Sequence, residues 1–266
     1  MVKPFLRWAG GKRWILKHFS EFFPNLLFNN YHEPFLGGAS LFLFLRPQKK
    51  AYLSDLNVEL IETYVAVRDD IDRVISELRK FKNTEEVYYK IRNSTFKSDY
   101  KRAARFIFLN QTSFNGIYRV NLKGEYNVPY GYRKVNFFDP HNLRAVSENL
   151  KNAVLDSKDF SLCIANVKKD DLVFLDPPYT ITHNNNGFFK YNKNLFSETD
   201  QRRLSQVIDQ IKAKQAFYIL TNAAHDRVKT IFNKGDRVME FQRASLVGGA
   251  QAERGKYEEL LITNIQ

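Results

Sequence analysis

The chain has 266 residues, of which 44% are hydrophobic and 26% charged, so it can bury a sizeable core and a largely disordered chain is excluded. Its single cysteine, Cys163, excludes an internal disulfide framework and a cysteine-based zinc site, and its apolar neighbours predict a buried thiol. Lys and Arg (41) exceed Asp and Glu (29) by 12, which favours a polyanionic partner such as nucleic acid.

No apolar run approaches the roughly 18 residues that a membrane-spanning helix needs. The basic N-terminal segment contains no long apolar stretch with a cleavage site, so no secretory signal is recognisable. We therefore expect a cytoplasmic protein with no membrane partner.

Paired glycines mark the first two turns of the chain. Gly10-Gly11 precedes a predicted helix over residues 14–23, and Gly37-Gly38 separates a predicted strand from an apolar helix at 41–45. Such glycines let main-chain N–H groups approach an anionic or polar ligand, although each pair is also compatible with a simple tight turn. The full G-x-G-x-x-G pattern is absent, so the sequence gives no strong dinucleotide-binding prediction.

A second strand is predicted at 51–54, followed by Asp55 and a single helix over residues 58–80. A carboxylate at this place is suited to accepting hydrogen bonds from ribose hydroxyls. Alternatively, Asp55 with Asn57 caps the following helix, and the two roles are compatible.

Residues 83–140 differ in character, with ten Lys or Arg against five Asp or Glu and many aromatic residues. Helical patterns occur at 87–91 and 102–109, and turn signals within 114–131 predict loops and a β-hairpin. Arg119 on this hairpin is suited to a two-pronged contact with guanine, and Phe114 to insertion into a base stack. An exposed arginine and a packed phenylalanine on a surface hairpin remain the alternative.

Strand-like segments return at 153–155 and 172–175. Asp159 and Phe160 follow the first of these segments, and an acid beside an aromatic ring is suited to holding an adenine ring. The commoner alternative is a capping aspartate beside a phenylalanine of the core. Ser197 is a plausible N-cap for a helix through residue 212. Further strands are predicted at 217–221, 237–241 and 259–263, with a helix near 224–232 and a polar loop at 183–187.

Asp176-Pro177-Pro178-Tyr179 follows the apolar strand 172–175 directly. The prolines end the strand as a stiff turn that presents a carboxylate, bare carbonyls and an aromatic ring. Two acceptors, the Asp176 carboxylate and the Pro177 carbonyl, would localise the lone pair of the adenine amine and stabilise the charge that develops during attack. Tyr179 would stack on a base that has left the duplex. The less specific interpretation is a proline turn covered by a tyrosine.

In this order and spacing, the segments 7–12, 33–38, 55, 114–131, 159–160 and 176–179 resemble the Dam-like, D12-class DNA adenine-N6 methyltransferases. The resemblance spans nearly the whole chain. It implies an α/β fold that binds S-adenosylmethionine (SAM). In this fold, a Rossmann-like sheet consists of parallel strands with one reversed strand. The resemblance further implies an inserted, mostly helical target-recognition domain with a hairpin, which we place at 57–145, leaving 1–56 and 146–266 as the catalytic domain.

The resemblance also implies roles for individual residues. The predicted cofactor-binding residues are Trp8, Lys12, Glu33, Phe35, Gly37, Asp55, Asp159, Phe160 and Asp176. The predicted catalytic residues are Asp176, Pro177, Pro178 and Tyr179. The predicted DNA-binding residues are Arg7, Phe114, Asn115, Arg119, Asn121, Lys123, Arg133 and Lys134.

The expected reaction is direct methyl transfer from SAM to N6 of an adenine flipped out of double-stranded DNA, in a short palindrome such as GATC, without a metal. Protection against a cognate restriction endonuclease and marking of DNA for replication or repair both remain open as roles. We predict no obligate protein partner and a nucleoid-associated enzyme of bacterial or phage type. Two competing hypotheses are an RNA adenine methyltransferase and a non-catalytic DNA-binding protein.

Overall fold

A computed structural model of the chain describes residues 2–134, 136–179, 196–244 and 256–266. The polar loop predicted at 183–187 lies outside these residues. None of the helices in the described part of the chain combines the length and apolar character that a membrane span requires.

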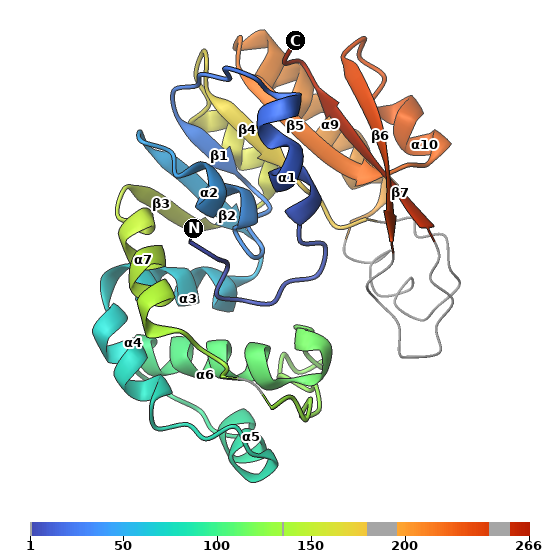
Figure 1. Cartoon of the computed structure of the whole chain (residues 1–266). Coiled ribbons are helices and arrows are strands. Elements are labelled where there is room, and N and C mark those ends of the chain that lie inside the picture. The colour runs from blue at the N-terminus through green and yellow to red at the C-terminus, as the bar shows by residue number, and fades with distance from the viewer. Residues whose placement is uncertain (1, 135, 180–195, 245–255) are drawn as a thin grey trace. The chain divides into compact units, whose positions relative to one another are not determined.

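Within the described residues, seven strands form one mixed sheet in the order β3-β2-β1-β4-β5-β7-β6 (Figure 1). The pairs β2–β3, β1–β4 and β4–β5 are parallel, whereas β7 runs antiparallel to both β5 and β6. The expected single reversed strand is thereby confirmed as β7. The strands are β1 (Tyr31–Glu33), β2 (Ala51–Asp55), β3 (Ala153–Ser157), β4 (Leu172–Leu175), β5 (Phe217–Ala223), β6 (Arg237–Ala244) and β7 (Lys256–Thr263).

Most helices lie at the predicted positions, but α7 (Pro140–Leu150) was not predicted and the helix expected over 58–80 is divided. The helices are α1 (Arg13–Phe22), α2 (Ser40–Leu45), α3 (Val58–Asp69), α4 (Ile71–Leu78), α5 (Glu85–Arg92), α6 (Asp99–Thr112), α7 (Pro140–Leu150), α9 (Glu198–Ala213) and α10 (Asp226–Ile231), with short 3₁₀ turns at Phe114–Gly116 and Phe160–Ala165. Ser197 caps α9 as predicted, in a reciprocal capping box with Asp200.

The prediction of one helix over 58–80 is wrong, because the chain breaks at Asp70. This residue adopts φ −140° and ψ 41°, outside the helical region. Its N–H donates to the Ala66 carbonyl to end α3, and its own carbonyl accepts from the Val74 N–H to begin α4. Two shorter helices therefore replace the long one.

The predicted hairpin over 114–131 is confirmed in outline, but it forms isolated bridges rather than continuous strands. Ser113 pairs with Tyr130 and Val120 with Tyr126, both antiparallel. The Asn121 side-chain oxygen accepts from the N–H groups of Lys123 and Glu125 and so closes the turn.

The chain forms two compact units, one of Met1–Phe19 with Leu36–Lys158 and the other of Ser20–Phe35 with Asp159–Gln266. The first holds β2, β3 and the helices from α2 to α7, and the second holds β1, the remaining strands, α9 and α10. The division into a catalytic domain and a target-recognition domain at 57–145 stays a prediction.

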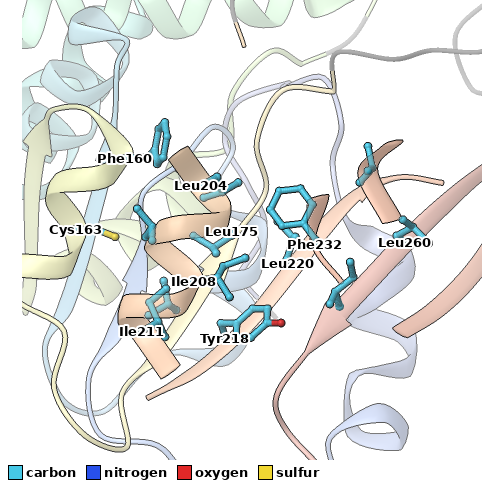
Figure 2. Close-up of a cluster of buried hydrophobic side chains, with 14 of the residues drawn as sticks. Phe160, Cys163, Leu175, Leu204, Ile208, Ile211, Tyr218, Leu220, Phe232 and Leu260 are labelled. Carbon is cyan, nitrogen blue, oxygen red and sulfur yellow. The ribbon is translucent and has the colours of Figure 1, made fainter. Parts of the chain in front are cut away.

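The core of the second unit lies between α9 and the sheet (Figure 2). Leu204, Ile208 and Ile211 recur at helical spacing along the buried side of α9 and join one cluster with Leu175 of β4 and Leu220 of β5. The cluster includes the buried thiol of Cys163, as predicted. α9 therefore packs against β4 and β5 next to the point where β4 ends and Asp176 follows.

Candidate functional site

The turn after β4 lies where the sequence places it. All four residues of β4 are buried, Asp176 and Tyr179 are half-buried, and the ring of Pro177 is buried while that of Pro178 is exposed. The hydroxyl group of Thr221 on β5 donates to Asp176 Oδ1 over 2.7 Å. A carboxylate at the carboxyl end of a buried parallel strand is thus held by the neighbouring strand.

Two of the buried residues of β1 in the same unit, Tyr31 and Glu33, contact each other. The Tyr31 hydroxyl donates to Glu33 Oε2 over 2.9 Å, and both side chains are almost fully buried. Burial, followed by the negative charges of Glu33 and Asp176, raises the pKa of Tyr31 well above its ordinary value. Tyr31 therefore keeps its proton near neutral pH and holds the Glu33 carboxylate by donating to it.

The ring of Phe160 belongs to the core of the second unit. Only 3% of Phe160 is exposed, and its ring stacks on Phe35 at 5.3 Å between centroids and meets Phe196 at 5.6 Å. The guanidinium carbon of Arg203 lies 4.9 Å from the centroid of the same ring. The ring of Phe160 is therefore part of the core, and its role toward a cofactor stays a prediction.

Asp159 is held in one orientation by three hydrogen bonds to Oδ1. The donors are the Ser161 N–H at 3.0 Å, the Ser161 hydroxyl at 2.5 Å and Arg203 Nη2 at 2.7 Å. Burial alone would raise the pKa of Asp159, but the hydrogen bonds from Ser161 and the charge of Arg203 outweigh it, so the pKa lies below its ordinary value. In the described structure Oδ2 accepts no hydrogen bond, which leaves it for a donor on a ligand.

The glycine turn at Gly37 lies in the first unit, against the ring of Trp8. Gly37 has φ +45°, and a Cβ atom there would stand 2.6 Å from Trp8 Cδ1. Asp55 Oδ2 accepts from the Gly37 N–H and Oδ1 from the Asn57 N–H, each over 3.0 Å. The cap of α3 is Asn57 itself, whose side chain accepts from the Leu60 N–H. Asp55 therefore secures the glycine turn and does not cap the helix.

Burial raises the pKa of the Asp55 carboxyl, while the N–H groups of Asn57 and Gly37 act in the opposite direction and limit the rise. Nearby, Lys12 is buried and its Nζ donates to the Gly10 carbonyl over 2.6 Å. The aromatic face of Trp8 stacks on Tyr118, with centroids 5.9 Å apart and planes 25° apart. Trp8 thus joins the glycine turn at Gly37 to Tyr118 of the hairpin.

Asn110 on α6 fixes Arg7 within the first unit. Its Oδ1 accepts from the Arg7 N–H over 2.7 Å, and its Nδ2 donates to the Arg7 carbonyl over 2.8 Å. The Arg7 side chain lies so close to Gly116 that a Cβ atom there would stand 2.6 Å from Arg7 Nε. Burial and the positive charge of Arg133 lower the pKa of Arg7. Arg7 Nη1 is buried and has no hydrogen-bond partner among the described residues, which suits contact with an acceptor on a ligand.

Replacing Asn110 with alanine should lower the free energy of unfolding by about 2 kcal/mol, because two hydrogen bonds from a buried side chain to the main chain of Arg7 are lost together. Urea unfolding followed by circular dichroism measures the change. Asn152→Ala provides the control, since Asn152 is exposed and its substitution should change stability by less than about 0.5 kcal/mol. Equal stability of the two variants would show that Asn110 does not fix Arg7.

Arg119 projects from the hairpin with an ordered guanidinium group. Its Nε donates to Asn127 Oδ1 over 2.8 Å and its Nη2 to the Asn127 carbonyl over 3.3 Å, while the side chain is exposed. The edge formed by Nη1 and Nη2 then faces away from Asn127. This arrangement leaves a two-donor edge for a planar acceptor pair, which is the geometry of a guanine contact.

Two buried tyrosines donate hydrogen bonds to main-chain carbonyls of the hairpin. Tyr88 donates to the Val128 carbonyl and Tyr126 to the Ile117 carbonyl, each over 2.8 Å. Burial raises the pKa of Tyr126 to about 12, so its hydroxyl remains a donor at neutral pH. These hydrogen bonds therefore hold the main chain of the hairpin, which carries the exposed residues.

The other predicted DNA-binding residues fall into two groups. Phe114, Asn115, Lys123, Arg133 and Lys134 are exposed, with 52% of Phe114 accessible to solvent. The side-chain oxygen of Asn121, in contrast, is engaged in closing the turn, and its Nδ2 donates to Glu125. Asn121 therefore shapes the hairpin, whereas the exposed residues are available to a partner.

Four residues with direct contacts to the predicted site do not stand out in the sequence. Thr221 contacts Asp176, Tyr31 contacts Glu33, Arg203 contacts Asp159 and Asn110 contacts Arg7. Only Tyr31 is close in sequence to its partner, and alternation within a short strand would have been the signal for it. The other three depend on long-range packing.

Comparison with known proteins gives consistent matches. Residues 8–245 match the sequence profile of the family described as D12 class N6 adenine-specific DNA methyltransferase. Type II methyltransferase M.MjaIII of Methanocaldococcus jannaschii is 38% identical over 244 residues, which is 84% of each chain. Type II methyltransferase M1.LlaDCHI of Lactococcus lactis subsp. cremoris is 33% identical, covering 99% of this chain and 95% of the relative. The DNA adenine methylase of Haemophilus influenzae is 30% identical, covering 97% and 92%.

The profile covers most of the chain, and relatives of similar length align over nearly all of it. The mixed α/β sheet with one reversed strand agrees with the fold that the resemblance implies. The chain therefore belongs to the D12 class of N6 adenine-specific DNA methyltransferases.

Proposed function

We propose that this enzyme transfers a methyl group from SAM to N6 of an adenine flipped out of double-stranded DNA, at a short palindrome such as GATC. The observation that carries the proposal is the turn at Asp176, where a carboxylate and the Pro177 carbonyl follow a buried strand. Two acceptors at one place match the two N–H bonds of an adenine amine. Membership of the family supports methylation of adenine in DNA. The use of SAM, the flipping of the base and the choice of a palindrome go beyond the family and belong to this proposal.

The first unit offers a fitting environment for part of SAM. Gly37 lets the main chain approach the indole of Trp8 so closely that a Cβ atom would collide with it, and Asp55 stands next to this turn with a carboxylate suited to ribose hydroxyls. When bound, SAM supplies a methyl group on a positively charged sulfur, which an amine can attack directly. We assign ribose recognition to Asp55 and adenine recognition to Asp159, through the oxygen that Ser161 and Arg203 leave unbonded.

Gly37→Ala should weaken SAM binding about tenfold, because the left-handed φ disfavours alanine by 1–2 kcal/mol and the added methyl group meets the Trp8 ring. Isothermal titration with SAM measures this effect directly. Gly235→Ala is the matched control, since Gly235 has φ +72° but open space around it, so it carries the backbone strain without the clash. If both variants bind SAM like wild type, the turn at Gly37 does not contact the cofactor.

At the target base, Asp176, Pro177 and Tyr179 of the turn have separate tasks. Asp176 accepts one N6–H bond and the Pro177 carbonyl accepts the other, which raises the electron density on N6 as it attacks. Tyr179 stacks on the base once it has left the duplex. The N6 proton that is lost after the methyl group has moved leaves through the Asp176 carboxylate toward water. No covalent bond to the enzyme is required.

The hairpin is proposed to recognise the DNA. Phe114 is exposed and suited to fill the space that the flipped base leaves, and Arg119 offers a two-donor edge to a guanine. Arg7, Asn115, Lys123, Arg133 and Lys134 supply further contacts, and the net charge of +12 attracts the phosphate backbone. A cognate restriction endonuclease and a role in marking DNA for replication or repair are both compatible with this activity.

Transfer of a labelled methyl group from SAM to unmethylated duplex DNA of random sequence, followed by mapping of the modified adenines, tests the proposal. Label confined to one short motif is expected, and GATC would support the full assignment. Label spread over DNA without a motif would contradict the role of Arg119. Label on RNA alone, or SAM binding without transfer to any nucleic acid, would favour one of the two competing hypotheses.

A further inference from the structure

We propose that Thr221 is a positioning residue, which holds the carboxylate of Asp176 in the one orientation that can accept from the target amine. The inference rests on the proposed function, because it concerns how the same site achieves its geometry. Thr221 itself touches neither base nor cofactor in this proposal. Its hydroxyl acts only through Asp176.

The two residues lie side by side because of the register of the sheet. β4 and β5 are parallel, and Leu175 is the partner of Leu220, so the residues that follow each of them stand at the same level. The Thr221 hydroxyl lies 2.7 Å from Asp176 Oδ1 and 3.5 Å from the Leu175 carbonyl oxygen. The shorter contact is a hydrogen bond to a charged acceptor, which is the stronger of the two.

Thr221 is itself well fixed. It is fully buried, and its strand is paired on both sides, with β4 and with β7, where Leu261 is its partner. The next residue, Asn222, donates to Gln201 Oε1 on α9 over 3.1 Å. A β-branched side chain in such a place has few accessible rotamers, so its hydroxyl is a stationary donor.

Asp176, in contrast, is half-buried on a turn beyond the end of its strand. The terminal torsion of an aspartate is broad, so the backbone alone does not determine the direction of the two oxygens. A fixed donor on one oxygen restricts that torsion. Because methyl transfer requires close alignment of acceptor and amine, a loss of this restriction should reduce the rate of the chemical step more than the binding of either substrate.

The test compares Thr221→Val, which replaces the hydroxyl with a methyl group, and Thr221→Ser, which keeps it. With saturating SAM and duplex DNA, the valine variant should lose roughly tenfold in kcat while KM for both substrates stays within about twofold of wild type. The serine variant should restore kcat to within about threefold. Thr221→Ala, which removes the hydroxyl and adds no atom, gives the same comparison if valine is not accommodated.

Thr263→Val is the matched control. Thr263 is also fully buried on a strand, and its hydroxyl donates to the Tyr218 carbonyl over 2.5 Å, but its strand partner on β5 is Ile219, away from the turn. This variant should be less stable and yet keep the wild-type kcat. Thermal unfolding of all variants separates stability from rate.

Unchanged kcat in Thr221→Val would overturn the inference, and so would an equal loss in Thr263→Val, which would assign the effect to stability. A loss in Thr221→Ser as large as in Thr221→Val would assign it to side-chain shape. Failure of the wild-type enzyme to methylate DNA would instead refute the proposed function, and the inference with it. The wild-type measurement thus distinguishes the two failures.

Discussion

Asp176→Ala should reduce the turnover of methyl transfer by roughly 10³-fold, because a preorganised charged acceptor at the reacting amine is removed. The remaining Pro177 carbonyl can accept only one of the two N6–H bonds. Duplex binding should stay within about threefold of wild type, since most of that affinity comes from cationic contacts to phosphates. Single-turnover methylation and fluorescence anisotropy with labelled duplex DNA measure the two quantities separately.

Two further variants sharpen this test. Asp176→Asn keeps an oxygen but loses the charge, and its single amide oxygen must serve both Thr221 and the target amine, so an intermediate loss of turnover is expected. Asp209→Ala removes the same charge from an exposed carboxylate that pairs with Lys234 and should leave turnover unchanged. Near-normal turnover in Asp176→Ala would refute the role of this carboxylate.

Arg119→Ala should relax the choice of sequence at one guanine by about tenfold to a hundredfold, because a bidentate contact to guanine contributes about 1–3 kcal/mol of discrimination. Asn127 already holds Nε and Nη2, so the free edge of the guanidinium group meets the base without much loss of side-chain entropy. The measurement is kcat/KM for a set of duplexes, each with one base pair of the preferred motif replaced.

Lys123→Ala is the control for a phosphate contact, since Lys123 is exposed on the turn of the same hairpin. It should weaken activity on all duplexes alike and reduce the dependence of binding on salt. Arg119→Lys keeps the charge and loses the fork, so it should discriminate nearly as poorly as the alanine variant. A uniform loss over all duplexes in Arg119→Ala would make Arg119 a phosphate contact as well.

Local patterns in the sequence predict much of this fold. The strand at Leu172–Leu175 is an unbroken apolar run that ends at prolines, and Ser197 precedes Asp200 at the spacing of a capping box, so both follow from neighbouring residues alone. The helix break at Asp70 escapes such reasoning because no glycine or proline marks it. A single backbone torsion outside the helical region is not visible in the spacing of apolar residues.

The features of the site likewise divide into those that local sequence predicts and those that depend on long-range contacts. The position of the Asp176 turn is predictable, but the hydrogen bond from Thr221 joins residues 45 apart and requires the register of two strands. The bonds between Asn110 and Arg7 span 103 residues. For Phe160 the sequence allows both a ligand-binding ring and a core ring, and only the packing of Phe35 and Phe196 shows that the ring is part of the core. The signal for these contacts lies in tertiary structure.

The place of β7 between β5 and β6 has a consequence for biosynthesis. Until residues 256–263 leave the ribosome, β6 has no neighbour within the described sheet and β5 is paired only with β4. The nascent chain therefore exposes unpaired main-chain groups on two strands for the time needed to synthesise the segment between them, and such edges favour pairing with other chains. The sheet is completed only when β7 inserts between β5 and β6, so pairing of these strands with other chains competes with that step.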